Sequence, residues 1–570
     1  MLRVLARVLL LLLALPAHAA RPYRGGVVAT LYPQASEAGL QMLDRGGNAV
    51  DAAVATAFAA AVVGPFHNGL AGGGFALVAL QGKDVLALDF REVAPAAASR
   101  DMFLRDGKPV PRLSTDGALS VAVPNAVNGY LALLDRAGAL PRSVVLAPAI
   151  RLAREGLVVT PKYRQIATGR LECLRGDPEA ARLFLRPGPD GRPGVPALGT
   201  RLRQPELART LERIAASGEA AVRTGPIARS IVQTVRGGGG ILTEEDLARV
   251  KPRWRAPLWG SYRGHRIATF PPPSGGGVIL LETLGVLERL RPNGFERRAP
   301  GDLHLYIESL RRAYADRARF VSDPDQTEVP TARLLSAEHI AELAASIDPN
   351  RATPSSALQP PGAADATPPS QIKHTSQISA LDRAGNAVSL TTTLNYGFGS
   401  CLVARGTGLL LNDQMDDFSI QPGIPNVYGL VYGEANAVAP GKIPVSSMTP
   451  ALVFQKEKPA RVLLAVGGSG GAFIPTGVIQ VLTNILDGRM NLPVAGAAGR
   501  VHHQWLPDVV MVSSDGLDPA TRAALEAMGH TFRVTESPLG DVEAVMEDPE
   551  TGLRTAASDP RGEGAGLGQP

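Results

Sequence analysis

Hydrophobic residues follow two different periods along the chain, and the change between them divides the sequence. Residues 120–345 repeat Leu, Ala, Arg and Glu at a period near 3.6, which predicts mostly helices. After about residue 372 the apolar residues alternate or form short runs, which predicts strands. The expected strands are 375–381, 387–394, 408–411, 451–454 and 462–466. We therefore expect a helical first part and a sheet-forming second part.

The first helices are predicted from caps and apolar faces. A strand is expected over residues 27–31, followed by a helix that Ser36 would cap and a Gly-Gly pair would end. Asn48 would cap a second helix that runs to about Val63. That helix is apolar on most sides, so we expect it to be buried.

A glycine-rich run at 69–74 precedes an apolar strand, 76–80. A phosphate-binding P-loop would need Lys and Ser or Thr after the last glycine, where Phe75 and Ala76 stand. A dinucleotide-binding fingerprint would need a strand before the glycines, where a helix is expected. We interpret the run as a close backbone approach within a core.

Two segments differ from the rest in composition. Residues 1–19 combine Arg3 and Arg7 with a short apolar run, 8–15, and small residues before position 20, which is typical of a secretory signal peptide. A helix of that run would span only ~12 Å, against a membrane core of ~30 Å. Residues 352–371 are rich in Pro, Ser, Ala and Thr, which predicts an exposed linker.

The composition excludes several classes of protein. Of 570 residues 45% are hydrophobic, which excludes wholesale disorder. The 58 basic and 53 acidic residues give a net charge of +5 without aromatic and basic interleaving, so we expect no nucleic-acid partner. Past the leader no apolar stretch is long enough to span a membrane, and we expect a periplasmic or secreted protein. The two cysteines and the histidine spacings predict no metal site.

One candidate nucleophile is Ser469, within the G-x-S-x-G pattern 467–471 that follows an expected strand. Asp487 and the downstream His502, His503 and His530 permit the order of a Ser-Asp-His triad. The alternative is a glycine turn whose backbone N–H groups act while Ser469 fills space. An early parallel sheet, which the serine hydrolase fold requires, is not predicted.

A second candidate is Thr375. A threonine becomes a nucleophile when it is N-terminal, because its own α-amine, with a pKa near ~7.7, then serves as the base. Cleavage of the His374-Thr375 peptide, after a Pro-rich linker and at the start of a strand, would produce that terminus. On position alone, Thr375 is also one strand-favouring threonine among many.

Further ordered motifs identify a family. The sequence resembles γ-glutamyltranspeptidases, members of the N-terminal-nucleophile hydrolase superfamily, over about residues 25–570. The motifs that carry the resemblance are GGNAVDAA at 46–53, DFRE at 89–92, DRAGNAV at 382–388, LNDQMDDF at 411–418, PVSSM at 444–448, HHQWLPD at 502–508 and ASDPR at 557–561. The resemblance implies an α+β fold, a four-layer αββα sandwich, made from one precursor. Cleavage between His374 and Thr375 would leave a large subunit, 20–374, which ends in a flexible linker, 352–374, and a small subunit, 375–570, as a heterodimer.

The resemblance also implies a role for each site residue. Thr375 would be the nucleophile, supported by Thr393, with Gly470 and Gly471 as backbone donors to the oxyanion. Arg91, Ser446 and Ser447 match the residues at the substrate carboxylate, Asn395, Gln414 and Asp417 those at its ammonium, and Tyr428 a lid tyrosine. The amide at position 395 favours a γ-glutamyl over a glutaryl group.

The activity implied is a γ-glutamyltransferase and glutathione hydrolase that forms a γ-glutamyl ester on Thr375. Amino acids, dipeptides or water would accept the group, and no cofactor or metal is needed.

Ser376 and Gln377 replace the Thr-His that follows the nucleophile in many members, which leaves the processing rate open. Cys173 and Cys401 would fall in different subunits. Two buried free thiols and one disulfide both stay open, and a disulfide would join the subunits. Three alternatives stay open: a glutaryl or cephalosporin acylase of the same fold, a serine hydrolase using Ser469, and a non-catalytic binding protein that stays uncut.

Overall fold

The computed structural model describes residues 21–297, 299–358, 374–536 and 538–570. The expected signal peptide, 1–19, and most of the expected linker lie outside the described residues. None of the helices in the described part of the chain is long and apolar enough to cross a membrane.

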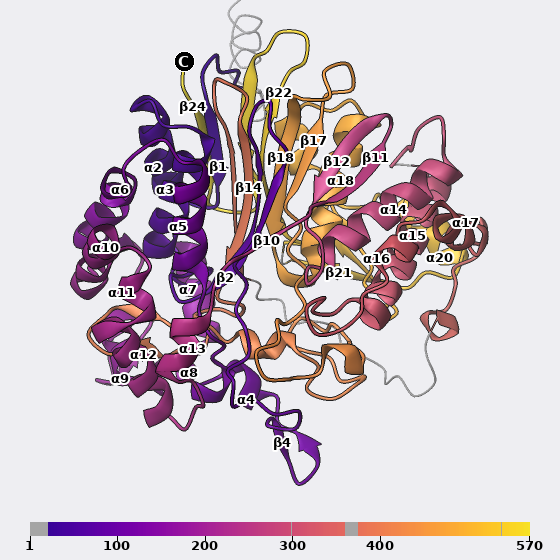
Figure 1. The fold of residues 1–570 in the computed structure, drawn as a ribbon. Coiled ribbons are helices and arrows are strands. Elements are labelled where there is room, and N and C mark those ends of the chain that lie inside the picture. Colours follow the sequence, from indigo (N-terminus) through magenta and orange to yellow (C-terminus); the bar gives the residue numbers. More distant parts are fainter. Residues whose placement is uncertain (1–20, 298, 359–373, 537) are drawn as a thin grey trace, which may run out of the picture.

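Two antiparallel sheets form the centre of the molecule (Figure 1). The seven-stranded sheet has the order β10-β3-β2-β14-β13-β1-β24. Its strands are β10 Arg253–Arg255, β3 Leu86–Asp89, β2 Gly73–Ala79, β14 Ala387–Thr393, β13 Ser376–Leu381, β1 Val27–Thr30 and β24 Ala565–Gly568. The six-stranded sheet has the order β11-β12-β17-β18-β22-β23. Its strands are β11 Leu258–Tyr262, β12 His265–Thr269, β17 Ala451–Phe454, β18 Val462–Ser469, β22 Asp541–Glu547 and β23 Arg554–Ser558.

Helices cover the outer face of each sheet, so the layers follow the order αββα (Figure 1). Over the seven-stranded sheet and behind it lie α2 Pro33–Asp44, α3 Ala49–Val63, α5 Ala126–Ala137, α6 Arg142–Glu155 and α10 Pro205–Ser217. Over the six-stranded sheet and behind it lie α14 Gly276–Leu290, α15 Pro300–Phe320, α17 Ala337–Ala345 and α18 Ile474–Leu486. Strands β13 and β14 pack against β18 across the middle of the molecule. The expected α+β sandwich is confirmed.

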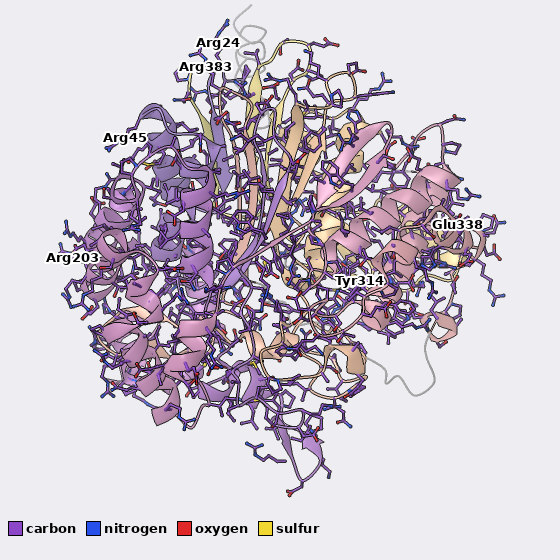
Figure 2. The ribbon with its side chains drawn as sticks, viewed as in Figure 1. Arg24, Arg45, Arg203, Tyr314, Glu338 and Arg383 are labelled. Carbon is purple, nitrogen blue, oxygen red and sulfur yellow. A yellow bond between two sulfur atoms is a disulfide. The ribbon has the colours of Figure 1, made fainter. Side chains whose placement is uncertain are left out.

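Shorter elements surround these layers. The further helices are α4 Arg112–Thr115, α7 Pro161–Gly169, α8 Leu171–Arg175, α9 Pro178–Phe184, α11 Ala220–Arg223, α12 Gly225–Gly237, α13 Glu244–Arg249, α16 Thr331–Leu334, α19 Leu492–Ala497 and α20 Pro519–Ala527. A small sheet contains β19 Val501–His502, β20 Val510–Ser513 and β21 Phe532–Thr535. Figure 2 shows charged side chains such as Arg24, Arg203 and Glu338 at the periphery, while Tyr314 lies inside.

The second helix confirms its predicted cap, and the first does not. The Asn48 side chain accepts hydrogen bonds from the amides of Val50 and Asp51, at 2.8 and 3.2 Å, and α3 is buried along its length. Helix α2 begins at Pro33, before the predicted cap Ser36. Ser36 lies inside that helix and donates to the carbonyl of Ala565. Proline at the first helical position explains the earlier start, since its φ suits a helix.

The expectation that residues 120–345 are mostly helical is confirmed, but it missed three strands of the central sheets. Strands β10, β11 and β12 lie inside the segment predicted to be helical, and they join both central sheets. Arginine and leucine occur in this segment as in the neighbouring helices, which hid its strand character. The predicted exposed linker also begins too early, because Ser355 is buried and its hydroxyl donates to the carbonyl of Trp505 at 2.6 Å.

Candidate active site

Thr375 directly precedes β13, and its hydroxyl lies beside the peptide that would be cut. Its Oγ1 donates to the carbonyl oxygen of His374 and lies 3.3 Å from Oγ1 of Thr393, at the end of β14. The amide of Asn395 donates to the same Thr393 oxygen at 2.9 Å. Thr375 and Thr393 are both buried. The antiparallel pairing of β13 with β14 therefore places the expected nucleophile and its supporting threonine side by side.

The glycine-rich run 69–74, which leads into β2 and forms its first two residues, lets β2 approach β14 closely. A Cβ on Gly72 would lie 2.0 Å from the carbonyl oxygen of Thr393, and one on Gly74 would lie 2.1 Å from that of Thr391. Any side chain at either position would push β14 away. The predicted close backbone approach is confirmed, and its partner is the strand that carries Thr393.

A pocket collects most of the residues expected at the site. Its volume is about 280 Å³, which includes the part that is open to solvent. Expected residues in its lining are Arg91, Thr375, Thr393, Asn395, Gln414, Asp417, Tyr428, Ser446, Ser447 and Gly471. Leu430, Met448 and Ile474 also line it and were not expected. Gly470 lies next to the pocket in the chain, without lining it.

Arg91 and Asp417 form a buried ion pair in this pocket. Arg91 Nη2 lies 2.5 Å from Asp417 Oδ2, and Gln414 Nε2 donates to the same oxygen at 2.7 Å. Asn426, which was not expected, donates to Asp417 Oδ1 at 3.2 Å. Burial raises the pKa of Asp417, and the charge of Arg91 opposes that rise.

A second guanidinium lies behind the pocket. Arg317 on α15 donates through Nη2 to Tyr432 Oη at 2.8 Å and to Ser447 Oγ at 3.2 Å. Its Nε and Nη1 have no hydrogen-bond partner within the described part of the chain, although the side chain is fully buried. The sequence offered no signal for Arg317, because arginine is frequent throughout the predicted helices.

The expected oxyanion donors occupy a sharp turn between β18 and α18. Gly470 and Gly471 have φ of 123° and 57°, a region that L side chains rarely adopt. A Cβ on Gly471 would lie 2.5 Å from the ring of Tyr428. Tyr314 on α15 donates its hydroxyl to the carbonyl of Ala472 at 2.5 Å, which fixes the turn from behind. Backbone N–H groups at such a strand-to-helix turn can stabilise a developing oxyanion.

Tyr428 lines the pocket. Its hydroxyl donates to the carbonyl of Asn395 at 2.5 Å, and its ring lies against Gly471. The side chain is 4% exposed. These contacts fix the Tyr428 side chain in the lining of the pocket, and its role as a lid stays a prediction.

The alternative acid of a Ser469 triad has other partners. Asp487 accepts hydrogen bonds from Tyr262 Oη at 2.7 Å and Arg263 Nε at 2.6 Å. Ser469 is the last residue of β18 and does not line the pocket with Thr375. The arrangement favours the interpretation of 467–471 as a glycine turn.

The two cysteines form a disulfide, with Cα atoms 5.8 Å apart. Cys173 lies on α8 and Cys401 six residues after Asn395 of the pocket. Arg170 Nη2 lies 3.2 and 3.3 Å from the two sulfurs. The disulfide therefore crosses from one side of the expected cleavage point to the other.

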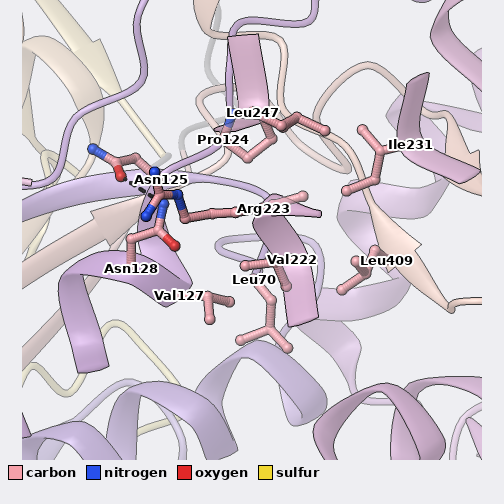
Figure 3. Close-up of a pocket in the computed structure, with 11 residues that line it drawn as sticks. Leu70, Pro124, Asn125, Val127, Asn128, Val222, Arg223, Ile231, Leu247 and Leu409 are labelled. Carbon is pink, nitrogen blue, oxygen red and sulfur yellow. Dashed lines mark hydrogen bonds between the residues drawn. The ribbon is translucent and has the colours of Figure 1, made fainter. Parts of the chain in front are cut away.

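A separate cavity between helices has a different character (Figure 3). Apolar residues such as Leu70 and Ile231 line most of it, and Arg223, Asn125 and Asn128 supply its polar side chains. Its lining residues include no serine, threonine or cysteine that could act as a nucleophile, and no two of them form an ion pair. The Thr375 pocket is therefore the stronger candidate for an active site.

Known proteins were compared with the whole chain. The sequence matches the gamma-glutamyltranspeptidase family over residues 35–569. The glutathione hydrolase proenzyme of Escherichia coli (strain K12) is 40% identical over 538 residues, covering 94% of this chain and 90% of that protein. The corresponding proenzyme of Pseudomonas aeruginosa is 40% identical over 548 residues, covering 95% and 94%. The crystal structure of cephalosporin acylase from Bacillus halodurans has a TM-score of 0.83 at 29% identity, covering 96% of each chain. This chain belongs to the gamma-glutamyltranspeptidase family.

Proposed function

We propose that the protein is an autoprocessing γ-glutamyltransferase and glutathione hydrolase with Thr375 as its nucleophile. The observation that carries the proposal is the Thr375 hydroxyl beside the His374 carbonyl, at the edge of a pocket with a buried Arg91–Asp417 pair. Family membership and the similar glutathione hydrolase proenzymes support the same activity.

The first reaction would cut the chain. Thr375 Oγ1 attacks the carbonyl carbon of His374, the C–N bond to Thr375 breaks, and an ester joins the two parts. The α-amine of Thr375 is freed and takes up a proton as that C–N bond breaks. Water then hydrolyses the ester, which restores the Thr375 hydroxyl and leaves a carboxylate on His374. That amine supplies the base that the uncut chain lacks, and a large subunit ending at His374 stays packed with a small subunit, 375–570.

The pocket would then bind the amino-acid head of the donor. A γ-glutamyl group carries one carboxylate and one ammonium, which would replace the direct Arg91–Asp417 contact. Arg91, Ser446 and Ser447 would take the carboxylate, and Asn395, Gln414 and Asp417 the ammonium. Exchange of one buried ion pair for two matched pairs keeps every charge compensated, which a low-dielectric site requires.

Transfer would follow in two steps. Thr375 attacks the γ-carbonyl, the amides of Gly470 and Gly471 stabilise the oxyanion, and the leaving amine takes a proton. A γ-glutamyl ester stays on Thr375 until water, an amino acid or a dipeptide resolves it. Double-displacement kinetics are expected.

The decisive experiment expresses the full chain with its leader, beside Thr375→Ala. We expect two subunits on reducing gels, a small one whose N-terminal sequence begins Thr375-Ser376-Gln377, and γ-glutamyl amide hydrolysis. Thr375→Ala should stay a single inactive chain. An uncut but active chain would move the nucleophile to Ser469, and an uncut, inactive wild-type chain would favour a binding protein.

N-terminal sequencing of the large subunit tests the predicted loss of residues 1–19 and hence export to the periplasm or medium.

An acylase of the same fold is the nearest alternative, because the similar Bacillus halodurans structure is a cephalosporin acylase. A glutaryl donor has no α-ammonium and gains nothing from Asp417. Direct comparison of γ-glutamyl and glutaryl amides separates the two: a higher kcat/KM on the glutaryl amide would replace our assignment.

A further inference from the structure

Glu282 is a buried carboxylate away from the Thr375 pocket. It lies on α14, its side chain is 0% exposed, and neither carboxylate oxygen has a hydrogen-bond partner among the residues that the structure describes. Burial of an unpaired carboxylate is costly, so such a group needs either a proton or a cation. Its surroundings decide between the two.

Two further ligand-type side chains meet Glu282. Asp316 lies on α15 and His339 on α17, and Asp316 Oδ2 is 2.7 Å from His339 Nε2. One carboxylate oxygen of each acid and one nitrogen of His339 all lie within 4.8 Å of one another. Asp316 is 9% and His339 7% exposed, so the cluster adjoins the surface. Three helices thus converge on one small set of oxygen and nitrogen atoms.

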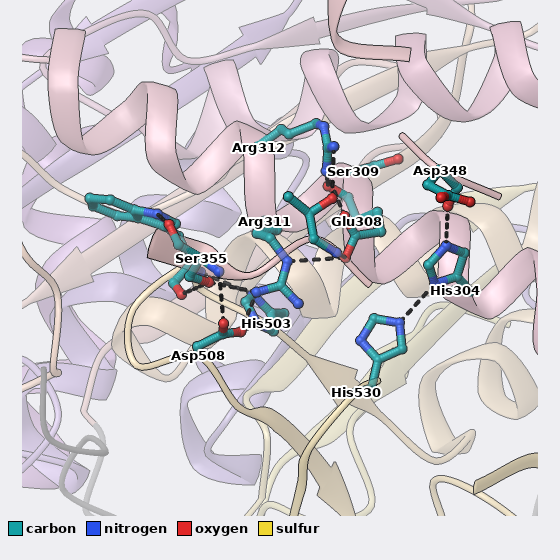
Figure 4. A network of polar contacts seen from close by, with 12 residues as sticks. His304, Glu308, Ser309, Arg311, Arg312, Asp348, Ser355, His503, Asp508 and His530 are labelled. Atoms are coloured by element: carbon teal, nitrogen blue, oxygen red, sulfur yellow. Dashed lines mark hydrogen bonds and ion pairs between the residues drawn. The ribbon is translucent and has the colours of Figure 1, made fainter. Parts of the chain in front are cut away.

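In a second cluster in the same helical layer, arginine side chains balance the charge of a buried carboxylate (Figure 4). Glu308 lies near His304 and His530, but Arg311 and Arg312 already approach its carboxylate to 3.0 and 2.7 Å. In the described residues neither Glu282 nor Asp316 forms an ion pair with lysine or arginine. The Glu282 cluster therefore holds two acids without a protein cation, apart from what His339 can supply.

We propose that Glu282, Asp316 and His339 bind a divalent transition-metal ion of the zinc type. Two carboxylates and one imidazole form a mixed oxygen and nitrogen set that Zn²⁺ accepts in tetrahedral geometry, with water as the fourth ligand. In tetrahedral geometry, bonds of about 2.0–2.2 Å place ligand atoms about 3.3–3.6 Å apart, so binding would need side-chain shifts of about 1 Å. Two carboxylates and a dication give a neutral site. Because the ligands come from three helices, no local spacing in the sequence indicates them.

The ion would act on the structure around the pocket. Asp316 is next to Arg317, which contacts Ser447, and two residues after Tyr314, which holds the Ala472 carbonyl. Fixing Asp316 to α14 and α17 would therefore stabilise the helix behind the active site. A structural role of this kind adds no step to the transfer reaction.

The test uses the full protein as purified, whether cut or uncut, stripped with a chelator and then titrated with ZnCl₂ by calorimetry, with bound zinc counted by mass spectrometry. We expect one equivalent per chain and a higher Tm with zinc. Glu282→Gln and His339→Gln should each weaken binding by about 100-fold or more, since loss of an outer-shell partner alone costs 10–100-fold. Glu543→Gln is the matched control, because Glu543 is equally buried, on β22, and should bind zinc as the wild type does.

Either of two results would overturn the proposal. Absence of zinc binding by the stripped wild type would mean that Glu282 is held as a neutral acid. Equal binding by the wild type, Glu282→Gln and His339→Gln would place the zinc elsewhere. Neither readout depends on γ-glutamyl transfer, so failure here leaves the proposed function untouched, and the reverse also holds.

Discussion

Asp417 accepts hydrogen bonds from Arg91, Gln414 and Asn426. Because Asp417 is buried, loss of its charge would leave these donors without a charged acceptor. In Asp417→Asn the ammonium of a γ-glutamyl donor loses its only charged partner in the proposed arrangement. Removal of one partner from a buried charge pair costs about 2–4 kcal/mol, so kcat/KM should fall about 30- to 1000-fold. Steady-state rates with a γ-glutamyl anilide measure the change.

The control for Asp417→Asn is the donor itself. A glutaryl anilide lacks the ammonium, so the substitution should change its kcat/KM much less. Equal losses on both donors would show that Asp417 maintains the pocket as a whole and does not read the ammonium.

Gly471 tests the oxyanion turn. In Gly471→Ala a Cβ would meet the Tyr428 ring at 2.5 Å, at a backbone φ of 57° that alanine disfavours. Displacing one oxyanion donor lowers kcat by about 10²–10³. Gly496→Ala is the control, because a Cβ there meets nothing within 4 Å, and it should keep wild-type kcat. Wild-type kcat in processed Gly471→Ala would remove this glycine from the mechanism.

At this scale the sequence identified residues by motif and missed those that act by packing. Asp417 stands in the motif 411–418, and Thr375 was a candidate because it follows a Pro-rich linker and starts an expected strand. The family resemblance supplied the role of each. Arg317 and Asn426 contact the same pocket from segments whose composition is ordinary. Their roles depend on contacts across 130 and 9 positions of sequence, which periodicity and spacing do not encode.

Helix α15 is tied to the small sheet by a buried polar network, shown in Figure 4. His503 accepts from the amide of Trp505 at 3.1 Å and lies 3.3 Å from Asp508, which also pairs with Arg311. Burial, with the nearby Arg311 charge, lowers the pKa of His503 to about 4. The folded protein therefore holds the neutral imidazole.

That shift predicts acid sensitivity with a definite sign. A depressed histidine pKa contributes stability above the unfolded value near 6.5, and the contribution is lost as the pH falls from 6.5 towards 4. At pH 5 the loss is about 2 kcal/mol. His503→Gln should thus show a smaller fall in Tm between pH 7 and pH 5 than the wild type. His265→Gln, on the partly exposed β12, should fall as the wild type does; a parallel fall in His503→Gln would exclude His503 as the cause.

Elements with a strong local signal were predicted well. The Asn48 cap and apolar sequence of α3, and the alternation of β13 and β14, gave bounds within one residue of those observed. Strands β10 and β12 pair with β3 and β17, which lie more than 150 residues away, so local propensity is too weak to reveal them. Strand β11 pairs with β12 across the short turn 263–264, a local hairpin that the sequence analysis missed.

Over the whole molecule, each central sheet takes strands from both sides of the expected cut. In the seven-stranded sheet β13 lies between β14 and β1, and in the six-stranded sheet β12 pairs with β17. The two subunits would therefore share both sheets and the core between them. Separation would expose that core, so we expect cleavage at His374-Thr375 to leave the fold intact.

The Cys173–Cys401 disulfide makes a stronger prediction about the same assembly. The two cysteines lie on opposite sides of the expected cut, so processing should give subunits that are linked covalently. Denaturing gels without reductant should show one band that contains both subunits, and gels with reductant should show two. Cys173→Ser should show two bands in both conditions, while processing and N-terminal sequence stay unchanged. Two bands from the exported wild type without reductant would mean that the cysteines are not joined, and that packing of the shared sheets alone holds the subunits together.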